Sequence, residues 1–207
     1  MNRRAFMLAT LFAALPVHGR TERFARGLLW RVAKDGVPAS HVYGTIHVAD
    51  ARLAELPGAV RQSFDAAKSL MLEFVPDAYS RERFLEASIG LSREVVNKLK
   101  PWGDSLAQRD ELTELAERTL EAYLERDLGA IWRLREQFAA RHPQIAPHQA
   151  VMTKRVVHDR SVVMAFRMQR QLRRGEAFVA LGALHLYGEK GVLSLLEADG
   201  YRADRVF

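Results

Sequence analysis

The distribution of apolar and polar positions divides the chain into a strand-rich beginning, a helical middle and a mixed end. Near the beginning, 28–32 and 40–43 are apolar runs typical of strands, and the turn-forming residues of 34–38 between them predict a hairpin. A short helix is expected over 58–67, and a buried strand over 70–75.

Apolar residues then recur at helical spacing from about residue 77 to residue 175. Pro101 and the proline-containing stretch 143–147 divide this region into separate helices, because proline removes a backbone donor and clashes with the preceding turn. We therefore expect a helical insertion that occupies about half of the chain.

The end of the chain returns to alternating elements, with strand 177–181, helix 192–198 and strand 201–207, and Gly200 marks the end of the helix. Strands joined by helical crossovers imply a partly parallel sheet. The predicted fold class is α/β: a small mixed, partly parallel central sheet, with a large helical insertion over about 77–175 that covers its carboxyl edge.

The first residues have the features of an export signal. Arg3 and Arg4 form a basic start, and the apolar stretch 5–17 that follows is too short to span a bilayer comfortably. We predict a signal peptide over 1–19, either an ordinary or a twin-arginine signal, and a single domain over 20–207. The mature protein is expected in the periplasm or outside the cell, without a membrane anchor.

Composition narrows the chemistry further. With 48% hydrophobic and 27% charged residues the chain is typical of a globular protein, and without cysteine any metal ligands must be imidazoles or carboxylates. The formal charge of +6 falls to +4 without Arg3 and Arg4. Basic residues alternate with acidic ones instead of forming a stripe with aromatics, so no nucleic-acid partner is expected. No oligomeric state follows from the sequence.

The pattern Gly-x-x-His occurs twice, as Gly44-Thr45-Ile46-His47 and as Gly182-Ala183-Leu184-His185. Each copy ends an apolar strand-like run, so both histidines are expected just beyond the carboxyl end of a strand. That edge is where ligands bind in open α/β sheets, and glycine lets the backbone turn sharply there. The two motifs suggest one metal site built from both ends of the chain.

Glu73 interrupts an otherwise apolar strand, and an unpartnered buried carboxylate is costly. It either forms a salt bridge with an arginine of the helical insertion or serves as a third metal ligand beside His47 and His185. Such a site leaves a position open for water, which suits hydrolysis, with an amide as the favoured bond. Asp50 and Glu189, shortly after the motif histidines, are either solvated carboxylates, or acceptors that orient the histidines, or a general base.

A series of motifs in a fixed order resembles the TraB/GumN family, relatives of the Tiki proteases, over about 28–206. The residues that carry the resemblance are Leu29-Trp30-Arg31-Val32, Tyr43-Gly44-Thr45-Ile46-His47-Val48, Leu72-Glu73, Gly182-Ala183-Leu184-His185-Leu186, Gly188, Gly191 and Gly200-Tyr201. The resemblance implies a divalent-metal-dependent hydrolase of the metalloprotease kind. His47, His185 and Glu73 would hold Mn, Co or Zn, and the expected substrate is a peptide or protein.

The family also tends to carry an Arg-Asn pair before the last motif, and here Arg160 is kept while Ser161 replaces the asparagine. Glu73 and Arg160 are the predicted catalytic residues. Arg160 would bind a substrate carboxylate or stabilise an oxyanion, unless it is the buried partner of Glu73. Two alternatives stay open: a haem or small-ligand binding protein of the same fold, with Tyr187 beside His185, and metal-free acid-base chemistry by the same groups.

Overall fold

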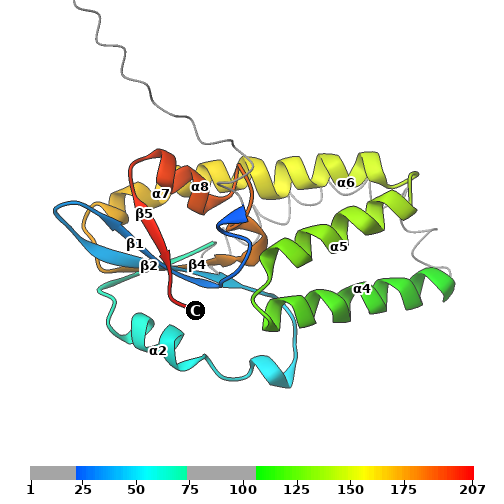
Figure 1. Cartoon of the computed structure of the whole chain (residues 1–207), viewed down its shortest axis with the longest axis horizontal. Helices are drawn as coiled ribbons and strands as arrows, with labels where there is room; N and C mark the ends of the chain where they lie inside the picture. Colours follow the sequence, from blue (N-terminus) through cyan, green and yellow to red (C-terminus); the bar gives the residue numbers. More distant parts are fainter. Residues whose placement is uncertain (1–21, 74–105) are drawn as a thin grey trace, which may run out of the picture.

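The computed structural model describes residues 22–73 and 106–207 (Figure 1). These residues form a mixed five-stranded sheet with the order β3-β4-β2-β1-β5 and with helices around it. The predicted α/β fold class is confirmed. The predicted signal peptide and residues 77–105 of the predicted insertion, Pro101 among them, lie outside the described residues.

The first two strands form the predicted hairpin. β1 (Leu29–Lys34) and β2 (Val37–Thr45) are antiparallel, with Leu29 opposite Tyr43, and Gly36 makes the turn with a φ of 75°. Glycine adopts this left-handed conformation without the steric cost that a Cβ imposes.

The last elements also follow the sequence prediction. β4 (Ala177–Gly182) is followed by α8 (Val192–Ala198), and β5 (Arg202–Arg205) pairs antiparallel with β1. Gly200, with a φ of 85°, ends α8 and turns the chain into β5.

Three strands present their carboxyl ends at the same edge of the sheet. β2 and β3 (Ser69–Leu72) both run parallel to β4, with Thr45 paired with Gly182 and Leu72 with Ala180. The residues that follow these three strand ends carry both Gly-x-x-His histidines and Glu73. The topology therefore brings the predicted functional segments to one edge.

Helices cover both faces of the sheet and extend past this edge (Figure 1). α7 (Arg160–Leu172) and α8 lie on one side of the sheet, and α2 (Gly58–Asp65) lies on the other. α4 (Leu106–Leu124), α5 (Leu128–Arg141) and α6 (Ala146–Met152) form the helical extension. None of the described helices combines the length and the hydropathy of a transmembrane span.

Local signals explain where these helices begin and end. Asp127 caps α5, since its carboxylate accepts a hydrogen bond of 2.7 Å from the Ala130 N–H and also pairs with Arg26 at 3.0 Å. α5 ends at Arg141, and Pro147 lies in the first turn of α6. The expected division of the helices at 143–147 is confirmed.

The core lies between the sheet and the helices on its two faces. On the α2 side, the Phe178 ring lies 6.2 Å from that of Tyr43 and 5.4 Å from that of Phe64. Burying one large apolar side chain contributes about 1.5–3 kcal/mol, so the core supplies most of the favourable free energy of folding. Its largest fully buried members are Trp30, Phe24, Leu28, Leu29, Leu128, Met168, Leu172, Leu181, Leu186, Leu193, Leu196 and Val32.

A strand is present at the position of the one predicted over 70–75, but the predicted burial is wrong, and residues 74 and 75 lie outside the described residues. β3 ends at Leu72, it lies at the edge of the sheet, and Leu70 and Leu72 are each about half exposed. An apolar run indicates a strand, but its pattern does not show whether the strand has one neighbour or two. Glu73 consequently follows the strand end instead of interrupting a central strand.

Gly44 is packed so closely that a methyl group at this position would displace its neighbours. A Cβ at this position would lie 2.6 Å from Leu186 Cδ1 and 3.1 Å from Ala183 Cα. We expect Gly44→Ala to lower the free energy of unfolding by about 1–3 kcal/mol, the usual cost of overpacking, in urea denaturation. Gly58→Ala is the control, because a Cβ there meets open space. Equal stability of the two variants would contradict this packing.

Candidate active site

Glu73 is held at the carboxyl edge by backbone and side-chain contacts. Its N–H donates to Ala180 O at 3.0 Å, and its Oε2 accepts from the Gly182 N–H at 2.8 Å. Its Oε1 accepts from Arg160 Nη2 at 2.6 Å. Glu73 therefore forms a salt bridge with an arginine of the helical region, which is one of the two roles that the sequence suggested for it.

His185 lies in the 3-10 turn η3 (Ala183–His185) directly after β4, with only 5% of its surface exposed. Its Nδ1 lies 3.2 Å from Val157 O and 2.9 Å from Ser161 Oγ. A carbonyl oxygen only accepts hydrogen bonds, so we infer that Nδ1 carries the hydrogen. Nε2 is then the ring nitrogen that faces Glu73, and it lies 3.6 Å from Glu73 Oε1.

Ser161 and a π-helical turn position this imidazole. The π turn η2 (Thr153–Asp159) precedes α7, and Ser161, which is fully buried, donates to Val157 O at 2.7 Å. π turns inside helical segments are frequent at functional sites, because they redirect backbone groups that an α-helix would pair. Here Val157 O and Ser161 Oγ both face the same nitrogen of His185.

The surroundings of Glu73 keep its carboxylate ionised. Burial by itself would raise the pKa of this carboxyl, but interactions with the His185 imidazole, the Gly182 N–H and the Arg160 guanidinium lower the pKa to about 2. At neutral pH the site therefore contains a half-buried anion beside a guanidinium cation.

The structure does not place His47 in this cluster. His47 follows β2 at the same edge, but its side chain is exposed. Among the described residues no group of three or more His, Asp or Glu side chains is arranged to hold a metal ion. The shared site expected from both Gly-x-x-His motifs is therefore only partly assembled, by His185 and Glu73.

The two other carboxylates near the motif histidines lie apart from the cluster. Asp50 caps the 3-10 turn η1 (Ala51–Leu53) and accepts two hydrogen bonds of 2.8 Å from the Arg52 guanidinium, which lower the pKa of Asp50 to about 2. Glu189 is exposed. Tyr187, the candidate haem ligand, is half-buried, and its hydroxyl lies 3.4 Å from Glu22 Oε1.

His185 and Glu73 together have the geometry of two ligands to one ion. Two donor atoms each about 2.1 Å from a tetrahedral metal ion lie about 3.4 Å apart, close to the 3.6 Å between His185 Nε2 and Glu73 Oε1. Arg160 contacts the same oxygen, so a cation bound there would have to share or replace that contact. Within 22–73 and 106–207, the donor set provides two ligands and no third protein ligand in the same group.

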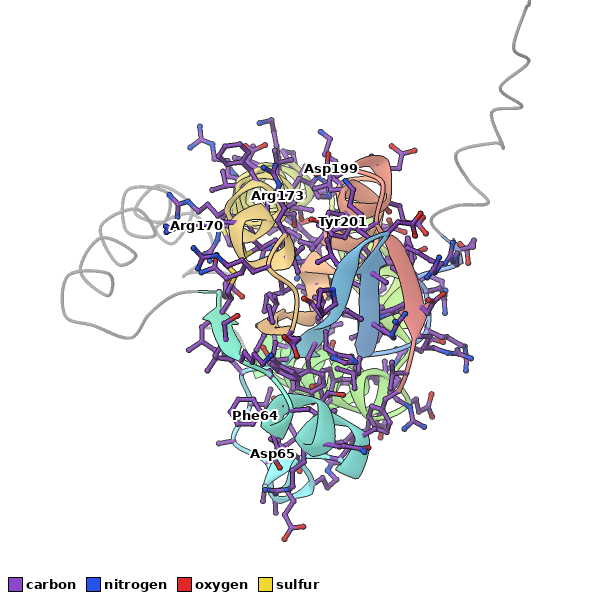
Figure 2. All side chains as sticks on the ribbon, turned by 90° about the vertical axis from the view of Figure 1, so that its left-hand side faces the viewer. Phe64, Asp65, Arg170, Arg173, Asp199 and Tyr201 are labelled. Carbon is purple, nitrogen blue, oxygen red and sulfur yellow. The ribbon has the colours of Figure 1, made fainter. Side chains whose placement is uncertain are left out.

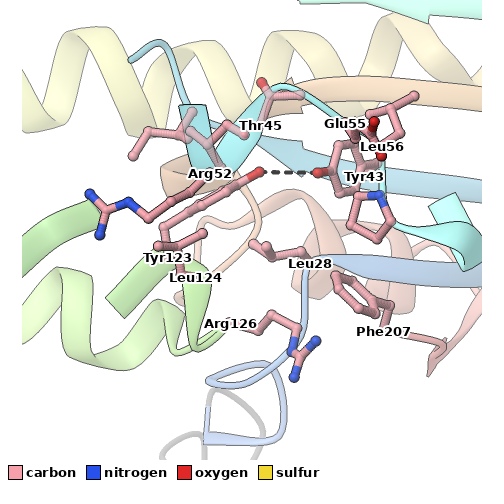
Figure 3. Close-up of a pocket in the computed structure, with 13 residues that line it drawn as sticks. Leu28, Tyr43, Thr45, Arg52, Glu55, Leu56, Tyr123, Leu124, Arg126 and Phe207 are labelled. Carbon is pink, nitrogen blue, oxygen red and sulfur yellow. Dashed lines mark hydrogen bonds between the residues drawn. The ribbon is translucent and has the colours of Figure 1, made fainter. Parts of the chain in front are cut away.

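A cavity of about 220 Å³ lies beside this edge on the α2 side of the sheet (Figure 3). Thr45, at the end of β2, lines the cavity and is paired with Gly182 at the end of β4. The cavity therefore begins on the strand next to the Gly182 N–H, which binds Glu73. At its inner end the Tyr43 and Tyr123 hydroxyls lie 3.2 Å apart, and Tyr123 donates to Gly44 O. The lining is mostly apolar, with Leu28, Ile46, Leu53, Leu56, Pro57, Leu124 and Phe207.

Sequence reasoning missed Ser161, the Gly182 N–H and the Val157 carbonyl as parts of the site. A signal for Ser161 was available, since it shares one helical face with Ala165, Met168 and Leu172, all buried apolar residues. A lone serine on such a face needs a hydrogen-bond partner. The two backbone groups carry no sequence signal, because every residue except proline has them.

These features define an α/β protein with a carboxylate, an imidazole and a guanidinium gathered beyond the carboxyl ends of parallel strands. The sequence model of the TraB/PrgY/gumN family matches residues 28–92 and 98–205, most of the chain. The chain belongs to this family, as its motifs predicted. No curated protein and no solved structure matches the chain.

Stability at low pH is expected to depend on Glu73. A carboxyl whose pKa falls from 4.5 to about 2 on folding stabilises the protein fully above about pH 4.5, and this contribution is lost as the pH falls toward 2. Urea unfolding at several pH values should therefore show a smaller loss of stability on acidification for Glu73→Gln than for the wild type. The exposed Glu125→Gln variant is the control and should follow the wild type. Parallel curves for all three proteins would contradict this account.

We expect Ser161→Ala to change the imidazole as well as the stability. Losing a buried hydrogen bond should cost about 0.5–1.5 kcal/mol in urea denaturation. Ser40→Ala is the matched control, because buried Ser40 accepts from the Ala177 N–H far from His185. Nitrogen-detected NMR should show a mixture of His185 tautomers in Ser161→Ala only. An unchanged imidazole spectrum would mean that Val157 O alone orients the ring.

Proposed function

We propose that this protein is a hydrolase whose centre consists of Glu73, His185 and Arg160, with a divalent metal ion as its cofactor. The observation that carries the proposal is the meeting of these three side chains from the β3 end, η3 and α7 at the carboxyl edge. The Arg160 and His185 nitrogens lie 2.6 Å and 3.6 Å from the same carboxylate oxygen. Ligands bind at this edge in open α/β sheets.

His185 is suited to proton transfer. Its Nδ1 is anchored by Val157 O and Ser161, which fixes the ring and leaves Nε2 as the reactive nitrogen. In a metal-free enzyme Nε2 would take a proton from the attacking water and return it to the leaving group. The ionised Glu73, 3.6 Å away, would stabilise the imidazolium in between.

Arg160 supplies the positive charge that an acyl-transfer reaction needs. Its guanidinium is 27% exposed and contacts Glu73, so it lies between the buried cluster and solvent. A fixed cation in a partly dry site stabilises the negative charge that develops on a carbonyl oxygen. The planar guanidinium also matches a substrate carboxylate.

His185 and Glu73 are the residues that would hold the metal ion, with His47 proposed as the third ligand. A bound Mn, Co or Zn ion would supply a water molecule of lowered pKa and polarise the bond to be cleaved. Zinc sites normally use three protein ligands, whereas Mg-like ions retain several waters and need fewer. The role of His47 therefore bears directly on the identity of the metal.

The neighbouring cavity favours a peptide as the substrate. Its lining is mostly apolar, and its 220 Å³ exceeds the roughly 150 Å³ of an engineered apolar cavity that binds benzene. An aromatic or branched aliphatic side chain therefore has room to enter, while the amide next to it lies at the strand ends. Because the chain also has a predicted export signal, we propose that the protein is a periplasmic or secreted peptidase.

Metal content and hydrolysis should be measured together on purified protein from metal-supplemented cells. We expect a stoichiometric divalent ion in the wild type, and its loss in His185→Ala and Glu73→Gln. Cleavage of a peptide library should fall at least about 100-fold in both variants, the scale of a lost acid-base group. His148→Ala is the control, because this histidine lies on α6.

The variants separate the competing interpretations. Loss of metal from His47→Ala would identify the third ligand, whereas retained metal would remove His47 from the site. Peptide cleavage that survives chelation but not His185→Ala would overturn the metal cofactor and leave acid-base chemistry. A Soret band on haem titration, lost in Tyr187→Phe and without peptide cleavage, would replace the hydrolase by a haem-binding protein.

A further inference from the structure

Five basic side chains gather on the outer side of α7 and near its C-terminal end. Together with Phe166, Gln169 and Asp199 they line a shallow depression of about 700 Å³. Figure 2 labels Arg170, Arg173 and Asp199 on this side of the molecule. We call this surface the α7 basic face, and its basic members are Lys34, Arg167, Arg170, Arg173 and Arg174. Lys34 comes from the end of β1, so residues far apart in the sequence form one cationic surface.

The positive charge on this surface is poorly balanced. Among the described residues that line the depression, Asp199 is the one carboxylate, and its Oδ2 already accepts from Gln169 Nε2 at 2.8 Å. Lys34 Nζ donates to the Asp199 carbonyl oxygen at 2.7 Å and lies 5.0 Å from the centre of the Tyr201 ring. Within 22–73 and 106–207, no ion pair involves any of the four arginines. The surface therefore attracts anions.

The same side of α7 also exposes large apolar groups. Phe166 is 80% exposed, and Val162 and Val163, one turn earlier, are each nearly half exposed. The opposite side of the helix is buried through Ala165 and Met168. Exposed apolar side chains are poorly solvated by water, and cations without an ion-pair partner attract anions. Together these two features are typical of an interaction surface.

We propose that the α7 basic face binds the surface of a bilayer that contains anionic phospholipids. Guanidinium groups bind lipid phosphates through paired hydrogen bonds, and an exposed phenylalanine inserts at the boundary between headgroups and acyl chains. A nucleic acid would satisfy the arginines but would give Phe166 no apolar medium. An acidic protein partner would need an apolar pocket placed opposite Phe166, whereas an anionic bilayer presents phosphates and an apolar interior over its whole surface. This combination favours lipid, and it is independent of the proposed hydrolase activity.

Sedimentation with large unilamellar vesicles tests the proposal on the mature protein, without the predicted signal peptide over 1–19, whose basic and apolar residues would bind anionic vesicles themselves. We expect binding to vesicles of phosphatidylglycerol mixed with phosphatidylcholine, and little binding to pure phosphatidylcholine. Arg170→Gln should lower the partition coefficient about fivefold, which corresponds to about 1 kcal/mol for one basic residue at an anionic surface. Phe166→Ser should also weaken binding, and high salt should weaken the wild type strongly.

Two controls keep the outcome decisive. Arg61→Gln, an exposed arginine on α2, should bind vesicles as the wild type does. Soluble polyaspartate provides an anion without an apolar phase. No binding to anionic vesicles by the folded protein would overturn the proposal. Binding that Phe166→Ser leaves unchanged and that polyaspartate matches would instead assign the surface to an acidic macromolecule.

Discussion

The contacts of the Glu73 carboxylate connect parts of the chain that are far apart in sequence. Arg160 lies 87 residues away and the Gly182 N–H lies 109 residues away, yet both bind this one group. The ion pair is partly buried, with side-chain exposures of 27% for Arg160 and 15% for Glu73, so removing one partner leaves a partly desolvated charge without its counter-charge. These contacts therefore join β3, α7 and the end of β4 to one another. The same contacts give the edge strand β3 a firm attachment at its carboxyl end.

The orientation of the His185 imidazole depends on the residues just before and at the start of α7, the helix that also carries Arg160. The π turn η2 turns Val157 O toward Nδ1, and Ser161 adds a second contact. These residues lie immediately before and at the start of α7, next to Arg160. One short segment therefore determines the orientation of His185 and the charge beside Glu73. A shift of α7 would alter both groups at once, so the site is a single structural unit.

α7 carries residues of both the proposed hydrolase centre and the proposed membrane-binding surface. Its first residues enter the Glu73 cluster, and its outer side carries the basic face with Phe166. The helix is rigidly packed through Met168 and Leu172, so its two ends and its two sides keep a constant orientation. A bilayer bound to the outer side would hold the hydrolase centre at a constant distance from the membrane. Substrates near or on that membrane would then reach the site preferentially.

The sequence predicted much of the fold because its signals are local. The hairpin, α8 and the helix boundaries at 143–147 follow from turn residues, apolar periodicity and proline, and the structure confirms them. The motifs predicted one site from His47, His185 and Glu73 beyond the carboxyl ends of strands, and the structure brings Glu73 and His185 of this set together. Family membership followed from the order of these motifs.

By itself, then, the sequence determined the α/β class, the family and the residue types available for chemistry. The tertiary structure decided that β3 lies at the sheet edge, that Glu73 pairs with Arg160, and that the His47 side chain is exposed. It also gathered Lys34 and four arginines of α7 and its C-terminal end into one basic surface, although basic and acidic residues alternate along the chain. The physical reason is that pattern and propensity act over a few residues, whereas burial, ion pairing and surface charge depend on which distant segments pack together.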